Sequence, residues 1–167
     1  KRMETIKKDL YKDKKCFIVG TGSSLNDIDL SLLDNEITIG INLILHKQDF
    51  VPDYLCVADT QVMKHNYNTV LSDRMSNGTY VIGNGCRMTG KGNCTDGPKD
   101  IYLLGCDGGW NHFYDRVQRG GKREWINYNH VKKELDKYGI NLVNCDVTNA
   151  FKELDYKKLE EVLNEPN

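Results

Sequence analysis

The sequence has no excess of charge of either sign. Its 167 residues include 23 lysines and arginines and 24 aspartates and glutamates, which gives a formal net charge of −1. Proteins that bind nucleic acid usually carry a basic excess, so this balance argues against such a partner. Hydrophobic residues make up 39% of the chain and charged residues 28%, a composition typical of globular proteins. The length suffices for one domain with a buried core.

Long apolar runs are absent as well. The runs are short, as at residues 101–105, and none approaches the roughly 20 residues needed to cross a bilayer. The first 15 residues alternate lysines with acids, unlike a secretory signal peptide. We therefore expect a cytoplasmic protein without a transmembrane segment. Peripheral attachment to a membrane and assembly into a homo-oligomer stay open at this point.

The six cysteines lack the spacing of a zinc site, because no CxxC pair and no neighbouring pair of histidines is present. Cys86 and Cys94 lie in a glycine-rich stretch. The others lie in or beside short apolar runs, where cysteine behaves as a small buried hydrophobe. We expect reduced thiols, with a bridge or a metal across residues 86–94 as the alternative. The four in apolar runs are Cys16, Cys56, Cys106 and Cys145.

Short runs of β-branched and aromatic residues predict strands that are buried on both faces. Amphipathic stretches between them predict helices, the clearest at 125–138, with others at 155–163 and 60–75. This alternation predicts an α/β, Rossmann-like, doubly wound and mostly parallel sheet of five to six strands, with helices on both faces. We expect a single domain over residues 1–167. Its irregular loop at 83–98 is either functional or a tolerated insertion. The predicted strands are residues 15–19, 36–41, 54–58, 79–82, 101–104 and 140–145.

A glycine-rich loop, Gly20-Thr21-Gly22-Ser23-Ser24-Leu25, follows the first predicted strand. In parallel sheets, ligands bind beyond the carboxyl ends of the strands. We expect a helix after this loop, and we expect the amides of Gly20 and Gly22 to be free for a phosphate. The third glycine of a dinucleotide fingerprint is missing, and so is the lysine of a Walker A loop. The loop therefore predicts a different kind of nucleotide, whose base or ribose Asn42 would contact at the end of the second strand.

Two aspartates follow other predicted strands. Asp59 comes after the third strand and Asp107 after the fifth. Carboxylates at this edge suit contacts with sugar hydroxyls, metal binding or general acid–base catalysis. The alternative is that each aspartate caps the helix or turn that follows it.

His112 lies just after Asp107 in an aromatic segment that includes Trp110, Phe113 and Tyr114. A histidine at a strand end suits a base near neutral pH, and a purely structural role is the alternative. Residues 116–123 then hold four cations and no acid. Their arginines form a candidate clamp for a phosphate or carboxylate, or else a solvated loop. These arginines are Arg116, Arg119 and Arg123.

The opening FIVGTGSSLN at residues 17–26 resembles the VGNGPSL opening of two families. They are the bacterial sialyltransferases of glycosyltransferase family 42 and the MptE-like (hydroxymethylpterin pyrophosphokinase-like) proteins. The similar segments span most of residues 15–163, although Thr21 and Ser23 replace the usual Asn and Pro. The alanine-rich helix that precedes the last matching strand in these families, and their lid insertion, are missing here. The other similar segments are residues 28–33, 36–42, 52–59, 100–107 and 112–114.

The resemblance implies a Rossmann-like transferase in which the glycine-rich loop and the second-strand Asn contact a cytidine nucleotide. It implies a histidine base, with His112 as the candidate counterpart, and no required cofactor or metal. The partners would be a CMP-activated sugar and a glycan or small-molecule acceptor. The resemblance assigns Gly20, Gly22, Ser23, Ser24 and Asn42 to the nucleotide, and we add Thr21 and Asp59 to these predicted nucleotide-binding residues.

We therefore predict a nucleotide-sugar-dependent glycosyltransferase of the sialyltransferase type. His112 and Asp107 are its predicted catalytic residues: His112 would deprotonate the acceptor hydroxyl, and Asp107 would line the sugar pocket together with Asp59. The first alternative is an MptE-like diphosphotransferase, which needs Mg²⁺ held by the two aspartates. The second is a non-catalytic module that binds a nucleotide or sugar.

Overall fold

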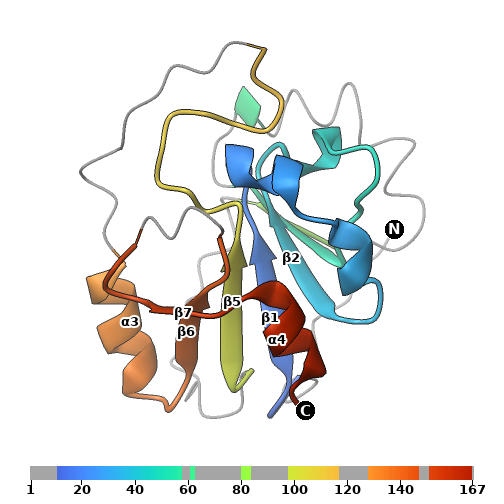
Figure 1. Cartoon of the computed structure of the whole chain (residues 1–167). Helices are drawn as coiled ribbons and strands as arrows, with labels where there is room; N and C mark the ends of the chain where they lie inside the picture. Colours follow the sequence, from blue (N-terminus) through green and yellow to red (C-terminus); the bar gives the residue numbers. More distant parts are fainter. Residues whose placement is uncertain are drawn as a thin grey trace.

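The computed structural model describes residues 11–57, 61–62, 80–83, 98–116, 128–146 and 151–166. Within these residues, seven strands form one sheet in which every neighbouring pair is parallel (Figure 1). Their order across the sheet is β4-β3-β2-β1-β5-β6-β7. The predicted α/β, Rossmann-like architecture is confirmed. The strands are β1 (Lys15–Val19), β2 (Ile37–Ile41), β3 (Tyr54–Val57), β4 (Tyr80–Gly83), β5 (Asp100–Leu104), β6 (Asn141–Asn144) and β7 (Asp155–Tyr156).

The first six strands match the predicted ones to within one residue at each end. The seventh was not predicted: residues 155 and 156 were expected to begin a helix. They pair instead with Val143 and Asn144 of β6 as a two-residue edge strand. Both Asp155 and Tyr156 are exposed, so neither carries the buried apolar pattern by which the other strands were recognised.

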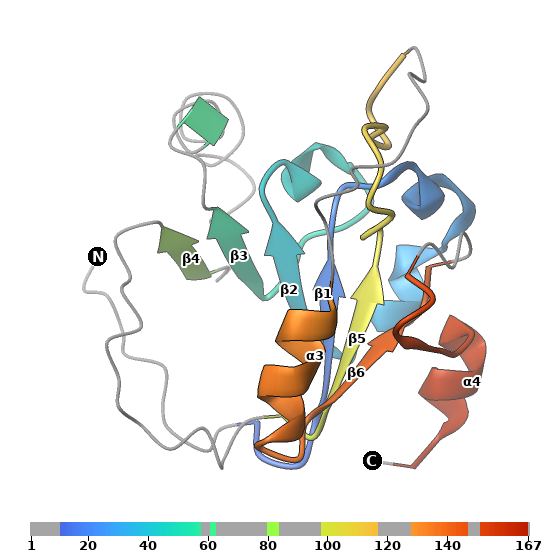
Figure 2. The same cartoon turned by 90° about the vertical axis from the view of Figure 1, so that its left-hand side faces the viewer.

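Two α-helices cover opposite faces of the sheet in the described residues (Figures 1 and 2). Leu135 of α3 (Asn129–Asp136) packs with Leu103 and Leu142 on one face. Leu159 and Val162 of α4 (Leu159–Asn164) pack on the other face. The residues beneath α4 form the larger core and include Phe17, Val19, Tyr102, Leu104 and Val143. Helices on both faces were predicted, and this is confirmed.

Short 3-10 helices take the place of the expected helix after β1. They are η1 (Ser23–Asp27) and η2 (Leu30–Leu33), and η3 (Ile44–His46) follows β2. Ile28 between the first two is extended, and the Asp29 side chain accepts a hydrogen bond from the Ser31 amide at 3.0 Å. Aspartate and asparagine compete for nearby backbone groups in this way, which favours caps and turns over a continuous helix.

The cysteines that the structure describes agree with the expectation of reduced thiols. The four described cysteines are free thiols, and Cys16 and Cys145 are buried. Burial raises the pKa of both thiols to about 12, so they are unreactive at neutral pH. Cys86 and Cys94 lie outside the described residues, as do most of the predicted helix at 60–75 and of the loop at 83–98. None of the described helices combines the length and apolar character that a membrane span requires.

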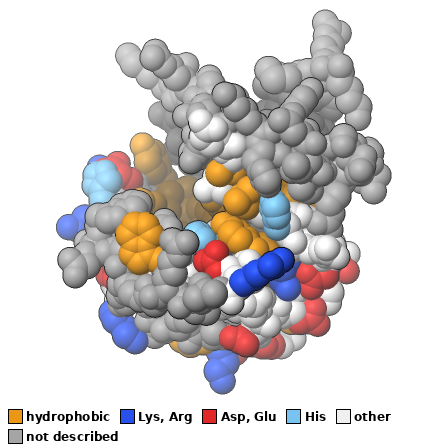
Figure 3. Space-filling model, turned by 90° about the horizontal axis from the view of Figure 1, so that it is seen from above, with side chains coloured by type: hydrophobic (Ala, Val, Ile, Leu, Met, Phe, Trp, Pro, Cys, Tyr) orange, Lys and Arg blue, Asp and Glu red, His pale blue; other side chains and the backbone are white. Residues whose placement is uncertain are grey.

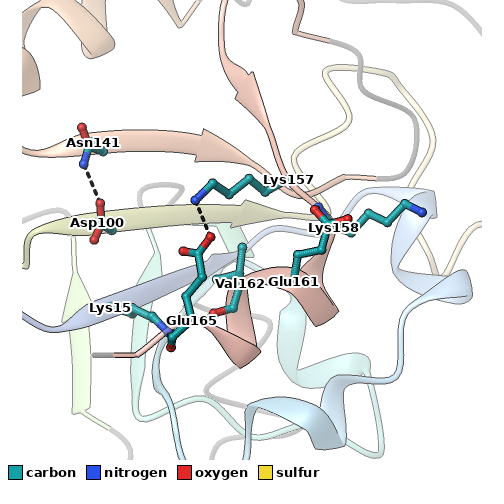
Figure 4. A network of polar contacts seen from close by, with 8 residues as sticks. All are labelled: Lys15, Asp100, Asn141, Lys157, Lys158, Glu161, Val162 and Glu165. Carbon is teal, nitrogen blue, oxygen red and sulfur yellow. Dashed lines mark hydrogen bonds and ion pairs between the residues drawn. The ribbon is translucent and has the colours of Figure 1, made fainter.

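A buried lysine joins the two ends of the described chain. Lys15 begins β1 and is only 6% exposed. Its ammonium group donates hydrogen bonds to the carbonyl oxygens of Val162, at 2.9 Å, and Glu165, at the end of α4 (Figure 4). A cation is favourable there, because the last carbonyls of a helix have no partner within it. The neighbouring pair of Lys157 and Glu165, at 2.6 Å, is half-exposed.

Replacing Lys15 with methionine should therefore destabilise the fold. Methionine keeps the apolar stem but removes both charge-assisted hydrogen bonds, at a cost of about 2 kcal/mol. For a chain of this size, that lowers the melting temperature by roughly 4–8 °C in a calorimetric scan. Lys157→Met is the matched control and should change the melting temperature far less, because its ion pair is half-exposed and screened by solvent. Equal effects of the two substitutions would contradict the role given to Lys15.

Candidate functional site

The candidate site lies where the strand order reverses. From β1 the chain continues to β2 on one side, whereas from β5 it continues to β6 on the other. The β1 loop (residues 20–25) and the β5 loop (residues 105–116) therefore leave two adjacent strands at their carboxyl ends. This reversal is the usual place for a ligand in an open parallel sheet. Figure 3 looks onto this end, where hydrophobic, histidine and acidic side chains lie close together.

Backbone hydrogen bonds hold the two loops together. The amide of Gly20 donates to the carbonyl oxygen of Leu104, and the amide of Gly22 to that of Gly105, both at 2.7 Å. The amide of Phe113 donates to the carbonyl oxygen of Thr21 at 3.0 Å. The β5 loop thus lies against the β1 loop along its length.

The expectation that the amides of Gly20 and Gly22 are free for a ligand is therefore wrong. A Cβ atom on Gly20 would lie 2.5 Å from the carbonyl oxygen of Gly105, and one on Gly22 would lie 2.4 Å from the Asp107 carboxyl carbon. Real Cβ atoms do not approach other atoms so closely. Glycine is needed at these positions because the chain's own β5 loop approaches the backbone there.

Asp107 lies against the serines of the β1 loop. Its Oδ2 accepts hydrogen bonds from the Ser24 amide at 2.8 Å and from the Ser23 hydroxyl at 3.3 Å. Its Oδ1 accepts from the Ser24 hydroxyl. Three predicted site residues thus come together, with the carboxylate on the Ser24 amide where a ligand's phosphate was expected.

The hydrogen bonds of Asp107 leave it little capacity to bind a metal ion. Asp107 already accepts three hydrogen bonds out of about four that a carboxylate can accept. The described residues contain no group of three or more side chains that could hold a metal ion. Asp59, the other predicted Mg²⁺ ligand, lies outside them.

His112 is held by a contact with the β1 loop and by two contacts within its own β5 loop. Its Nδ1 lies 2.9 Å from the Thr21 hydroxyl, and its backbone amide donates to Asp115 at 2.8 Å. Its ring stacks on Tyr114, with the centroids 5.1 Å apart and the planes within 7° of parallel. Because Thr21 engages Nδ1, Nε2 is the nitrogen that can exchange a proton with a ligand.

The end of β2 also reaches the β5 loop. Asn42 follows β2 with a φ angle of +52°, and its amide donates to the carbonyl oxygen of Cys56 at 2.9 Å. The ring of His46 in η3, a few residues on, lies 6.0 Å from that of Tyr114. Tyr114 therefore has His112 on one side and His46 on another, which links the loops after β1, β2 and β5.

Asp146 is a site residue that the sequence analysis missed. It follows β6 and is fully buried. Its Oδ2 accepts from the Cys106 amide at 3.0 Å, and its Oδ1 lies 3.3 Å from the Ser24 hydroxyl. Burial, and then the nearby Asp107 carboxylate, raise the pKa of Asp146 to about 7. The sequence does carry a signal, since a Cys-Asp pair follows both β5 and β6 within three residues.

The remaining predicted residues are only partly described. Arg116 is exposed, whereas Arg119 and Arg123 lie outside the described residues, so the cationic clamp stays a prediction. Tyr114, which stacks on His112, is 37% exposed, and Trp110 in the same loop is 49% exposed.

Comparison of the chain with protein-family models, curated proteins and solved structures finds no significant match. The function of the chain is therefore inferred from the residues at the carboxyl edge of the sheet. The combination to be explained is a fixed histidine, two exposed aromatic rings and a hydroxyl-rich loop at the point where the strand order reverses.

Proposed function

We propose that this chain is a nucleotide-sugar-dependent glycosyltransferase of the sialyltransferase type, with His112 as the base. The supporting observation is the 2.9 Å contact between His112 Nδ1 and the Thr21 hydroxyl, at the strand-order reversal. For Nε2 to accept a proton, Nδ1 must carry the ring hydrogen and donate it to Thr21. The Thr21 hydroxyl can accept that hydrogen, so the contact is compatible with the tautomer that a base requires, and the stacked Tyr114 holds the ring plane.

The donor nucleotide would lie between the β1 loop and Asn42. Since the amides of Gly20, Gly22 and Ser24 are engaged within the protein, the loop would contact the donor through its hydroxyl groups. The phosphate charge would be met by the four cations of residues 116–123, a segment that contains no acid. Asp107 would fix the serines of the loop.

The acceptor would approach from the side of Trp110 and Tyr114. Both rings are partly exposed in the loop that carries His112, and aromatic faces suit the apolar faces of sugar rings. A base must come within about 3 Å of the proton that it removes. The acceptor hydroxyl would therefore lie against His112 Nε2, with its ring on the aromatic surfaces.

One observation favours a second candidate, a binding module without transferase activity. The amides that would hold a phosphate are already occupied, and Asp107 lies at the loop. Such a module would bind a nucleotide or sugar weakly and leave it unchanged. The Mg²⁺-dependent diphosphotransferase has less support, because Asp107 has little remaining capacity for a metal.

Thermal shifts with nucleotides test the proposal directly. We expect CMP, at about 100 times its dissociation constant, to stabilise the protein by roughly 2.7 kcal/mol, and the shift to be the same with and without Mg²⁺. CDP, UDP, GDP and ATP are the comparison ligands. Turnover of a CMP-sugar then separates a transferase from a binding module. A stabilisation by ATP that requires Mg²⁺ would favour the diphosphotransferase, and no shift with any nucleotide would contradict both enzymes.

A further inference from the structure

Two carboxyl groups share one hydroxyl group beneath the candidate site. Ser24 Oγ donates its hydrogen to Asp107 Oδ1 and lies 3.3 Å from Asp146 Oδ1. The three residues come from different elements: Ser24 is in η1, Asp107 follows β5 and Asp146 follows β6. Ser24 and Asp146 are both buried, so water does not fill the contact.

The hydroxyl group of Ser24 has only one hydrogen, and it donates this hydrogen to Asp107. An ionised Asp146 would then bring a second carboxylate oxygen against lone pairs of Ser24 Oγ. A hydrogen on Asp146 Oδ1 turns the same contact into a donor–acceptor pair, while Oδ2 still accepts from the Cys106 amide at 3.0 Å.

The surroundings explain why the proton belongs on Asp146. Asp107 is partly exposed, and both of its oxygens already accept hydrogen bonds from the β1 loop. Asp146 is fully buried, which disfavours its charged form.

The other titratable groups near Asp146 do not change this assignment. Besides Asp107, the described groups that influence it are the thiols of Cys106 and Cys145 and the hydroxyl of Tyr128. Burial raises the pKa of each, so all three stay neutral, and no cation among them stabilises an ionised Asp146.

We propose that Asp146 is a positioning residue that carries a proton on Oδ1 and donates it to Ser24 Oγ, which donates in turn to Asp107. The chain from Asp146 to Ser24 to Asp107 fixes the β1 loop against the β5 loop. Ionisation of Asp146 removes the first hydrogen bond and loosens the loop. A role for this chain in sugar transfer rests on the proposed function, whereas the proton chain itself does not.

The first experiment compares the melting temperatures of the wild type and Asp146→Asn from pH 4 to 9. The folded state raises the pKa of Asp146 to about 7, above the value of about 3.9 in an unfolded chain. The stabilisation is therefore complete below about pH 4 and is lost as the pH rises through 7. Asparagine imitates the protonated acid at every pH. We expect the wild type to fall several degrees relative to the variant up to pH 7 and then to stay level.

Asp155→Asn is the matched control. Asp155 lies in β7 next to β6, but its side chain is exposed. This variant should keep a constant offset from the wild type over the same range. If Asp146→Asn also kept a constant offset, Asp146 would not hold a proton and the proposal would be wrong.

Hydrogen exchange at the Ser24 amide separates positioning from simple burial. This amide donates to Asp107 Oδ2 at 2.8 Å, so its protection reports whether the loop is held. Protection, corrected for the intrinsic rate, should fall between pH 5.5 and 8.5 in the wild type and stay constant in Asp146→Asn. Unchanged protection in the wild type would overturn the proposal. If the variant fails to fold, infrared spectra of the wild type at pH 5.5 must still show a buried protonated carboxyl, and its absence would refute the assignment.

Discussion

Replacing His112 with alanine is expected to lower transferase turnover by roughly 10²–10⁴-fold, the usual contribution of a general base. The ring nitrogen that would accept the acceptor proton is lost. Nucleotide affinity should change only a few-fold, because Thr21 and Asn42 remain. Steady-state kinetics with a CMP-sugar donor, together with nucleotide titration by calorimetry, measure the two quantities separately.

Thr21→Val is the companion to this variant. Valine preserves the shape of threonine but cannot bond to His112 Nδ1, whose contact with the Thr21 hydroxyl is 2.9 Å long. We expect a smaller loss of turnover than in His112→Ala, because the ring stays in place and only the hydrogen bond that orients it is lost. If His112→Ala lowered the melting temperature and left turnover intact, His112 would have a packing role only.

Replacing Gly20 with alanine should give the largest loss of stability. The new Cβ would lie 2.5 Å from the carbonyl oxygen of Gly105 and 3.0 Å from its carbonyl carbon. These are backbone atoms in the β5 loop, so the strain is relieved only by separating the two loops. We expect a cost of about 3 kcal/mol, at the upper end for overpacking, which lowers the melting temperature by roughly 6–12 °C.

Gly139→Ala provides the control for this substitution. Gly139 has a φ angle of +69°, but a Cβ there has nothing within 4 Å. It should therefore cost only the roughly 1–2 kcal/mol of a left-handed conformation. Gly20→Ala should also weaken nucleotide binding, whereas Gly139→Ala should not. If the two variants lost the same stability, the close contact between the β1 and β5 loops would not be the cause of the loss in Gly20→Ala.

The strands were predictable because the sheet is parallel and covered on both faces. Residues such as Phe17 and Ile18 must both be apolar, since each packs on a different side. The resulting runs are easily recognised. The turns after β1 were mispredicted as a helix, because the outcome depends on side-chain bonds such as that of Asp29 to Ser31. Such bonds leave little trace in hydrophobic periodicity.

The position of the site could be predicted from the sequence, but only some of the contacts within it could. Strand ends at the reversal of strand order identify Thr21, Asp107 and His112. Whether the Gly22 amide faces a ligand depends on how closely the β5 loop approaches, and here it donates to Gly105. Asp146 follows a predicted strand just as Asp59 and Asp107 do, but its full burial and its contact with the Ser24 hydroxyl, 3.3 Å away, arise only in the folded structure.

The central pairing of β1 with β5 has a consequence for the order of folding. β1 can pair with β2 early, because the two are close in the chain, but its other edge pairs with β5, as Cys16 does with Ile101. Ser23 and Asp107, which meet above this pair, are 84 positions apart. During synthesis, the backbone hydrogen-bonding groups on this second edge of β1 have no neighbouring strand until residues 100–104 emerge from the ribosome. Such an edge invites pairing with other chains, so the nascent chain should be most prone to aggregation while β5 is being made.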